Sequence, residues 1–451
     1  MYLKAPTGCD KYIPYIEKIT LGIIAAMDVL VVGSGGREHA LAWKLKQSPR
    51  IGKLYIAPGN GGTSTLGENV PIGQMEFEKL AQFAQEKKVG LTVVGPDDPL
   101  VGGIVDVFKA RGLRIWGPSR EAAQIEGSKA FSKQFMHEAK IPTAEFAVFS
   151  NAALALAHVR VKGAPIVIKA SGLSLGKGVY VCRDLTEAER AITEIMVERV
   201  HNDAGNEVVI EEYLDGPEIS IHALTDGYSH ILFPASQDHK PIGDGDVGEN
   251  TGGMGTIAPV PWVTPEMMSS VEGQIVTPTF EALKKNGIQF QGLLYPGLKV
   301  TLGGLEVLEY NARFGDPETQ VYMRLLKTDL LDLLEASVDG TIDALRTKIE
   351  WHRGFAANIV IASGGYPGEY KKELPITGIE DAEKVEGVVT FHAGTKIENG
   401  QVVTAGGRVL GVSAIGGTLK QALDRAYEAV GEIYFEGMYF RRDIGAKSLS
   451  A

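Results

Sequence analysis

The feature that most constrains the fold of this chain is a regular alternation of strand-like and helix-like segments that begins at Met27. The strand-like runs are residues 29–32, 53–57, 91–94 and 114–116. The helical patterns between them are residues 40–47, 77–87 and 100–110. Strands that alternate with helices form βαβ units, whose strands lie parallel in one sheet. The sequence therefore predicts an α/β fold that opens with a parallel-sheet domain over residues 27–127.

Two further regions follow, and each has its own pattern. Residues 128–345 read as a mixed domain that includes a small α+β lid at about 143–216. Its predicted helices are 128–139, 186–199 and 265–286, its predicted strands are 166–170, 179–182, 208–212, 218–225, 293–301 and 305–310, and 232–254 reads as loop. Residues 350–446 read as a third, mostly antiparallel domain. Its predicted strands are 355–362, 388–393, 402–404 and 409–414, followed by a helix at 418–435.

Charge and cysteine content narrow the class of protein. The 451 residues carry a formal net charge of −11, whereas nucleic-acid binders usually show a basic excess. The two cysteines, Cys9 and Cys182, form no disulfide or metal pattern, which fits a reducing compartment. Residues 1–26 are interpreted as an upstream extension outside the core, with a poor signal peptide as the alternative interpretation. Their longest apolar run, residues 19–26, is too short to span a bilayer. We therefore expect a cytoplasmic monomer that binds neither nucleic acid nor membrane.

A glycine turn, GSGGREH at residues 33–39, links the first strand to the first helix. Glycines here let backbone N–H groups approach an anion at the positive end of the helix. A nicotinamide-dependent oxidoreductase is one hypothesis for such a turn. It is disfavoured because Glu38 replaces the third glycine of the dinucleotide fingerprint, and no acid follows the second strand. The second strand instead ends in PGNGGT at 58–63, so two loops flank one crevice.

A buried strand with one lysine predicts a phosphate site. Lys169 lies in the apolar run 166–170 and is costly there unless it is paired. The glycine loop 171–178 follows, and its Gly172, Gly176 and Gly178 can fold over nucleotide phosphates, with Lys177 adding charge. The loop is not a Walker A motif, because a strand rather than a helix follows it. A plain glycine hairpin with surface lysines is the alternative interpretation.

The next apolar strand, 208–212, turns at acidic residues and predicts a nucleoside contact. The segment Glu211, Glu212, Tyr213 and Leu214 can read an adenine edge through its backbone, and Glu218 can accept from ribose hydroxyls. Solvated acids at a strand end are the alternative interpretation.

The strongest candidate for a metal site is the strand that ends in NARFGDPETQ, residues 311–320. Alternation along a strand places Glu309, Asn311 and Arg313 on one face. A carboxylate and an amide oxygen suit Mg²⁺, which takes phosphate oxygens as further ligands. Arg313 is then placed to clamp the transferring phosphoryl group. A polar strand face that meets solvent is the alternative.

A long polar loop, residues 237–255, predicts a second substrate site. Loops of this length inside a compact region are usually functional or disordered. Asp238, His239 and Lys240 are placed to hold a small amino acid, although a lone histidine is more often structural than catalytic.

Together these motifs resemble the ATP-grasp superfamily. Within it, the chain is similar to the phosphoribosylamine–glycine ligase family from Met27 to about Gly445. The motifs that carry the resemblance are GSGGREH (33–39), PGNGGT (58–63), GSKAF (127–131), QDHK (237–240), NTGGMG (250–255), NARFGDPETQ (311–320) and FHAGTK (391–396). The family fold implies a Rossmann-like N-terminal domain, a central ATP-grasp domain with its lid, and an antiparallel C-terminal domain.

The resemblance also implies a reaction and its ligands. ATP phosphorylates glycine to glycyl phosphate, and the amine of 5-phosphoribosylamine then displaces phosphate. Catalysis by Arg313 and Lys177 is implied, together with Mg²⁺ or Mn²⁺ at Glu309 and Asn311. The resemblance further implies that ATP binds at Lys129 and at the nucleotide residues named above. It also implies that the sugar phosphate binds at Gly35, Gly36 and Gly61.

Two residues depart from the family pattern. Ser171 stands where the family lid has aspartate, and Glu249 stands where a proline precedes NTGGMG. The lid change is expected to affect ATP closure, and Glu249 to loosen the loop. Two rival functions remain: another ATP-grasp ligase or carboxylase with a different acid and amine, and a non-catalytic nucleotide-binding regulator. The intact metal pair disfavours the regulator.

Overall fold

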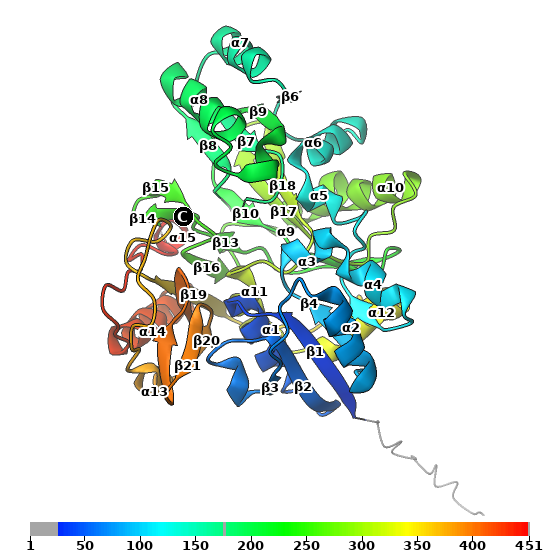
Figure 1. Ribbon diagram of the computed structural model, residues 1–451, viewed down its shortest axis with the longest axis vertical. Helices are drawn as coiled ribbons and strands as arrows, with labels where there is room; N and C mark the ends of the chain where they lie inside the picture. Colours follow the sequence, from blue (N-terminus) through cyan, green and yellow to red (C-terminus); the bar gives the residue numbers. More distant parts are fainter. Residues whose placement is uncertain (1–25, 175–176, 450–451) are drawn as a thin grey trace, which may run out of the picture.

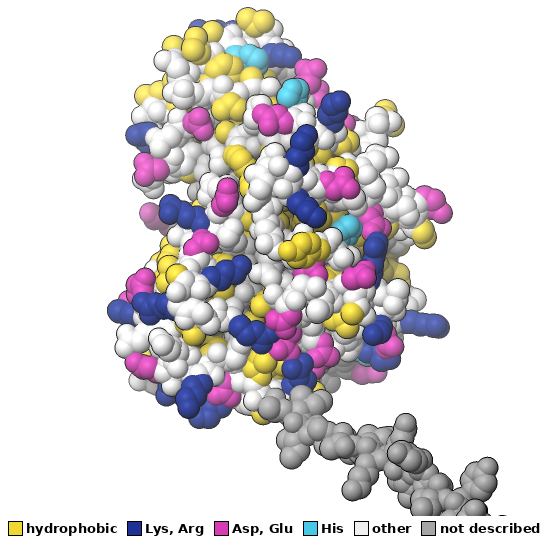
Figure 2. Space-filling model, turned by 90° about the vertical axis from the view of Figure 1, so that its right-hand side faces the viewer, with side chains coloured by type: hydrophobic (Ala, Val, Ile, Leu, Met, Phe, Trp, Pro, Cys, Tyr) yellow, Lys and Arg dark blue, Asp and Glu magenta, His cyan; other side chains and the backbone are white. Residues whose placement is uncertain are grey.

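The computed structural model describes residues 26–174 and 177–449. The predicted extension, apart from Ala26, and the predicted phosphate-loop residue Gly176 lie outside the described residues. Within this part of the chain, no helix is long and apolar enough to cross a membrane. Lys, Arg, Asp and Glu side chains are interspersed on the face drawn in Figure 2, so the coloured residues of this face form no basic patch.

The N-terminal domain is a five-stranded parallel sheet in the order β3-β2-β1-β4-β5 (Figure 1). Its strands are β1 (Met27–Gly33), β2 (Ile51–Pro58), β3 (Glu68–Asn69), β4 (Leu91–Val94) and β5 (Ile115–Trp116). Its helices are α1 (Gly36–Leu45), α2 (Phe77–Glu86), α3 (Asp97–Gly102) and α4 (Ile104–Ala110). The helix predicted over 100–110 is two helices, because Gly103 adopts a φ of +94° and ends α3.

The lid is a four-stranded antiparallel sheet in the order β6-β9-β7-β8, at the top of Figure 1. Its strands are β6 (Phe146–Phe149), β7 (Ile166–Ala170), β8 (Val179–Cys182) and β9 (Val208–Glu212), with helices α7 (Ala152–Lys162) and α8 (Leu185–Ile192) packed together. The predicted helix 186–199 continues past α8 only as a π turn, η2 (Thr193–Val197). The lid has its own apolar core, which includes Ile168, Ile192 and Ile210.

The central sheet carries the strand of the predicted metal pair. It pairs β10 (Glu218–Ser220), β17 (Gly292–Thr301), β11 (Ala223–Thr225) and β12 (His230–Leu232), and β18 (Gly304–Asn311) joins β17 as a hairpin. The single strand predicted over 218–225 is therefore two short strands. The helix predicted over 265–286 is α9 (Pro265–Val271), the π turn η4 (Glu272–Val276) and α10 (Thr277–Lys285). Helix α6 (Lys129–Glu138) follows the short α5 (Gln124–Gly127) and packs against β18.

The C-terminal sheet has the order β13-β16-β19-β23-β20. Strands β19 (Phe355–Ala362), β20 (Val388–His392) and β23 (Arg408–Gly416) come from the C-terminal region, with α14 (Leu419–Glu432) packed on them. Strands β13 (Gln237–Asp238) and β16 (Gly255–Ala258) come from the stretch predicted as loop, which also holds the hairpin β14 (Pro241–Gly243) and β15 (Val247–Asn250). The predicted amino-acid loop is thus anchored in the C-terminal sheet.

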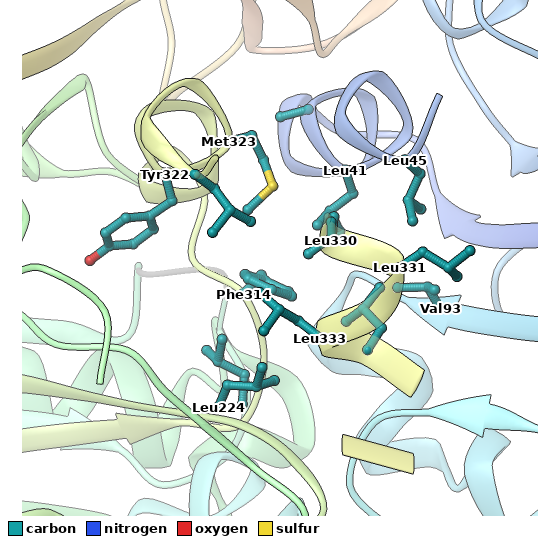
Figure 3. Packing of buried hydrophobic residues seen from close by; sticks show 14 of the residues in the cluster. Leu41, Leu45, Val93, Leu224, Phe314, Tyr322, Met323, Leu330, Leu331 and Leu333 are labelled. Atoms are coloured by element: carbon teal, nitrogen blue, oxygen red, sulfur yellow. The ribbon is translucent and has the colours of Figure 1, made fainter. Parts of the chain in front are cut away.

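A single apolar cluster joins the N-terminal and central domains (Figure 3). Side chains from α1, from α11 (Glu318–Leu325) and from α12 (Leu330–Asp339) converge on Phe314, which is fully buried. Burying one such aromatic side chain stabilises the fold by about 1.5–3 kcal/mol. Because Phe314 follows Arg313 and precedes Gly315, its burial also fixes the segment that leaves the strand of the predicted metal pair.

Candidate active site

A buried group of lysines surrounds one glutamate at the junction of lid and central domain. Lys169 of β7 and Lys133 of α6 both pair with Glu211 Oε2, at 2.9 and 3.0 Å. Lys169 also donates to the carbonyl of Leu308 at 3.0 Å. The sequence predicted a nucleotide phosphate as the partner of Lys169. In the structure, Glu211 and the carbonyl of Leu308 are its partners. Burial, only partly offset by Glu211, lowers the pKa of Lys133 to about 8.

The predicted metal pair lies beside this lysine group. Glu309, Tyr310 and Asn311 pair in regular register with Gly297, Pro296 and Tyr295 of β17, in that order. Residues two apart on a regular strand share a face, so the Glu309 and Asn311 side chains lie side by side. Burial favours the neutral acid, but Lys240, Lys129 and Lys169 together bring the pKa of Glu309 down to about 2. An ionised carboxylate next to an amide oxygen fits a divalent cation.

Arg313 contacts the metal pair although it is not a strand residue, because β18 ends at Asn311. Its Nη2 lies 3.1 Å from Asn311 Oδ1 and 2.9 Å from Glu126 Oε1, with Asp97 at 3.9 Å. Burial opposes the charge, yet Glu126 and Asp97 raise the pKa of Arg313. Burial likewise raises the pKa of Glu126 to about 7, with Arg313 opposing the shift and Asp97 adding to it.

The predicted amino-acid loop meets the same site through Lys240. Its Nζ lies 3.2 Å from Glu309 Oε1 and 3.9 Å from Glu218 Oε2. Burial works against it, but the carboxylates of Glu309, Glu218 and Asp238 raise the pKa of Lys240. The ammonium group of Lys240 therefore pairs with Glu309, the residue at which a metal ion is predicted to bind. Glu218, predicted to bind ribose, also pairs with Lys299 at 3.1 Å.

His239 has a different environment from its two neighbours. Its Nδ1 lies 3.1 Å from the carbonyl of Gly255, and its Nε2 accepts from the N–H of Gly445 at 3.1 Å. Burial lowers the pKa of His239 to about 4, so the ring stays neutral at neutral pH. Both ring nitrogens are hydrogen-bonded to backbone groups. These contacts therefore do not support the predicted contact between the imidazole and a substrate.

The phosphate loop of the lid contacts two other parts of the chain. The exposed Lys177 donates to the carbonyl of Pro367 in the C-terminal region at 2.7 Å. Lys129 donates to the carbonyl of Gly172 at 3.2 Å, and the carbonyl of Gly178 accepts from Ala170 at 2.8 Å. Lys129 is thereby brought to the loop, and its contact with ATP stays a prediction.

The predicted adenine segment lies at the lid edge. Glu211 is buried among the lysines, whereas Glu212 and Tyr213 are exposed and Leu214 is half-buried. Glu212 Oε1 accepts from the N–H of Glu145 at 3.0 Å. The side chain of Glu211 therefore pairs with the lysine group and is not free to contact a base.

The predicted sugar-phosphate glycines form a separate group at the start of α1. The N–H of Gly35 donates to Glu38 Oε2 at 2.5 Å, which caps the helix. A Cβ on Gly36 would lie 2.6 Å from Gln320 Nε2, and the N–H of Gly61 donates to the carbonyl of Thr395 at 3.1 Å. These glycines thus meet the NARFGDPETQ and FHAGTK segments rather than the lysine group.

Several residues of the site were missed in the sequence. Lys133, Glu126 and Arg408 lie outside the motifs named above, and Glu318 lies within NARFGDPETQ but was given no role. Lys133 lies one helical turn after Lys129, a spacing that places both on one face of a helix. Arg408 Nη1 donates to the carbonyls of Gly252 and Asp316, at 2.6 and 2.7 Å, and so ties two motif loops to the C-terminal sheet.

A parallel-sheet domain, a lidded antiparallel domain and a lysine-rich site with an acid–amide pair define an ATP-grasp enzyme. Family models of phosphoribosylglycinamide synthetase match as the N domain over 27–126, the ATP-grasp domain over 127–319 and the C domain over 356–447. The chain belongs to this family, whose members are named phosphoribosylamine–glycine ligase, and the predicted fold class and family are confirmed.

Individual relatives agree over nearly the whole chain. The phosphoribosylamine–glycine ligase of Chlorobaculum tepidum is 49% identical over 427 residues, 94% of this chain and 100% of the relative. That of a Nostoc species is 51% identical over 424 residues, 93% of this chain and 99% of the relative. The crystal structure of the Thermotoga maritima enzyme is 32% identical and covers 92% of this chain and 99% of its own, with a TM-score of 0.76.

Proposed function

We propose that this chain uses ATP to join glycine to 5-phosphoribosylamine, giving glycinamide ribonucleotide, ADP and phosphate in purine synthesis. The observation that carries the proposal is the ionised Glu309 beside Asn311, within the field of Lys129, Lys169 and Lys240. Family membership supplies the substrates. The composition supports a cytoplasmic enzyme, and we keep a monomer as the working state.

The reaction takes place in two steps. A carboxylate oxygen of glycine attacks the γ-phosphorus of ATP, the bond to the β-phosphate oxygen breaks, and ADP leaves. The amine of phosphoribosylamine then attacks the carbonyl carbon of glycyl phosphate, loses a proton and expels phosphate. The protein needs no covalent nucleophile, since positioning and charge neutralisation carry the catalysis.

We assign the nucleotide to the junction of the lid and the central domain. Lys129, Lys169 and Lys177 neutralise phosphate oxygens, and the glycine loop with Gly172, Gly176 and Gly178 covers them. Mg²⁺ or Mn²⁺ held by Glu309 and Asn311 supplies further positive charge to the phosphates. The adenine and ribose are assigned to the segment Glu211, Glu212, Tyr213 and Leu214 and to Glu218.

We assign the two other substrates to the opposite side of the metal pair. Arg313 and Lys240 face the amino acid and the transferring phosphoryl group, with Asp238 and His239 on the same loop. Gly35, Gly36 and Gly61 lie at the sugar phosphate, in the N-terminal domain of residues 27–127. The central domain is placed at 128–345 and the C-terminal domain at 350–446.

A substrate panel for ADP release tests this proposal. Purified protein with Mg²⁺ and ATP is expected to release ADP only when glycine and phosphoribosylamine are both present. ADP release that follows a different acid would indicate another ligase, and ATP binding without turnover would indicate a regulator.

A further inference from the structure

A small cavity lies where the central domain meets the C-terminal sheet. It has a volume of about 190 Å³ and lies between the end of α11, the start of β19, the end of β23 and α14. Figure 1 draws α14 in its lower half and the lid at its top, so the cavity is separate from the lid. Arg425, Arg353 and His352 line it, and none of the described residues that line it is acidic. The charged side chains at its wall are therefore all basic.

A half-buried arginine beside this cavity has no carboxylate partner. Arg324 precedes Leu325, which lines the cavity, and its Nη2 donates to the carbonyl of Gly387 at 2.6 Å. Its guanidinium lies over the ring of Trp43, 5.1 Å from the centroid. Nε is buried without a hydrogen-bond partner, and no carboxylate oxygen of the described residues lies within 4.0 Å of the group. Burial lowers the pKa of Arg324 to about 10. The ring attracts the cation through its face but leaves Nε unpaired.

Gly387 brings a second arginine close to the first. A Cβ on Gly387 would lie 3.3 Å from Arg425 Nη1, which donates to the carbonyl of Ile415 at 2.8 Å. Among the described residues, the carboxylate that pairs with Arg425 is that of Glu386, whose side chain is 85% exposed. Such a pair is weak, because solvent screens the attraction and ordering the side chains costs entropy. Glu386 can therefore turn to solvent and leave Arg425 to another anion.

Lys44 of α1 adds to the local excess of positive charge. It is buried, and its Nζ donates to the carbonyl of Leu326 at 2.5 Å. Burial lowers the pKa of Lys44, with Asp329 opposing the shift and Arg324 adding to it. Buried cations are usually paired with acids. Two cations that repel each other are eased when an anion binds nearby.

We propose that this cavity binds a phosphate group, held by Arg425 and Arg353, with Arg324 adding attraction from behind. The planar guanidinium groups suit phosphate oxygens, and the exposed His352 adds a donor at the rim. None of the lining residues belongs to the metal pair, the lysine group or the glycine loops. The site is therefore distinct from the proposed active site and does not depend on the proposed substrates.

Tryptophan fluorescence can measure binding, because Trp43 lies under Arg324 and Trp351 precedes His352. Inorganic phosphate is titrated at an ionic strength held constant with KCl, with saturating ADP and Mg²⁺ present to occupy the nucleotide site. We expect a saturable change with a midpoint in the low-millimolar range. Arg425→Gln and Arg353→Gln should each raise this midpoint about tenfold, the effect of losing one charge-assisted hydrogen bond.

Controls and a second ligand complete the test. Arg183→Gln, at an exposed position of the lid, is the matched control and should leave the midpoint unchanged. Glycerol 3-phosphate replaces inorganic phosphate in a second titration. A lower midpoint for this monoester indicates a phosphate ester as the ligand, and a lower midpoint for inorganic phosphate indicates the free ion; either result supports the site.

Two results would overturn the proposal. One is the absence of any saturable change in wild-type protein, and the other is the same midpoint in wild type, Arg425→Gln and Arg353→Gln. If Arg425→Gln does not fold, Arg353→Gln decides on the same midpoint, because Arg353 is exposed and its replacement should leave the melting temperature unchanged.

Discussion

At the residue scale, the site depends on charges that the fold keeps in place without ligands. Glu211 neutralises Lys133 and Lys169, and Lys240 neutralises Glu309. Buried ions that pair with each other avoid most of the desolvation cost that single ions would carry. Binding of a nucleotide and a cation therefore exchanges partners in an existing network rather than creating a charged site anew.

Replacing Glu309 tests the metal pair at this scale. Glu309→Gln removes the anionic oxygen but keeps the shape, and turnover should fall by about 100-fold or more, as for loss of a group that stabilises transition-state charge. The steady-state rate of ADP release at saturating Mg²⁺ measures the turnover. Glu281→Gln, at an exposed position of α10, is the surface control. Turnover within a few-fold of wild type would show that the cation binds elsewhere.

At the element scale, a helix of the central domain begins against the lid loop. Ser128 caps α6 by accepting from Phe131, and the Ser171 hydroxyl accepts from the N–H of Ala130 at 3.1 Å. Ser171 is the residue that replaces aspartate in the family pattern. The hydroxyl therefore supplies the acceptor that the first turn of α6 needs, and the substitution leaves no unpaired N–H at Ala130.

Removing this hydroxyl should destabilise the protein measurably. Ser171→Ala is expected to lower the free energy of unfolding by about 1 kcal/mol, the usual cost of a lost helix cap. Ser171→Asn keeps an acceptor and should lose less than half as much. Urea denaturation measures both variants. Equal losses in the two would mean that the hydroxyl does not act as a cap.

The sequence predicted most elements and missed those set by tertiary contacts. Periodicity found β1, β4, β7, β9 and the β17–β18 hairpin. It did not find the irregularity in β18, where Gly297 pairs with Glu309 but Leu298 pairs with Val307. The extra residue, Leu308, turns its carbonyl to Lys169. Such a bulge depends on the partner strand and on Lys169, so no local sequence pattern predicts it.

Site residues divide in the same way. The sequence indicated Lys169 and Glu309 because a charged residue in an apolar strand is costly, and Asn311 because strand alternation places it beside Glu309. Their roles in binding stay predictions. Glu318 and Arg408 could not be predicted, because their contacts come from distant segments of the chain: Ser220 and Tyr295 for Glu318, and Gly252 and Asp316 for Arg408. The strands β13 and β16 were missed because β13 pairs only with β16, and β16 pairs with β19, which lies about a hundred residues later in the chain.

At the scale of the whole molecule, buried histidines hold the N-terminal and C-terminal regions together. His39 of α1 accepts at Nδ1 from the N–H of His392 at 2.7 Å. Burial, together with the repulsion of His392, lowers the pKa of His39 to about 3, and burial lowers that of His392 to about 4. Between these values and about 6.5, the unfolded chain binds more protons than the folded one, so stability falls as pH drops.

Replacing His39 should flatten this acid sensitivity. Each such histidine contributes a slope of about 1.4 kcal/mol per pH unit below pH 6. His39→Asn keeps an acceptor but does not titrate, so the free energy of unfolding should fall less steeply from pH 6 to 4. Exposed His137→Asn is the control. Identical slopes for His39→Asn and wild type would contradict a neutral buried His39.

The central claim is that the carboxylate of glycine is phosphorylated before the amine attacks. Glycine labelled with ¹⁸O in both carboxylate oxygens tests it directly, by mass spectrometry of the phosphate released during turnover with phosphoribosylamine. Transfer of one labelled oxygen to each phosphate is predicted, because the bond that breaks in the second step joins carbon to that oxygen. Phosphate that carries no label would contradict the account.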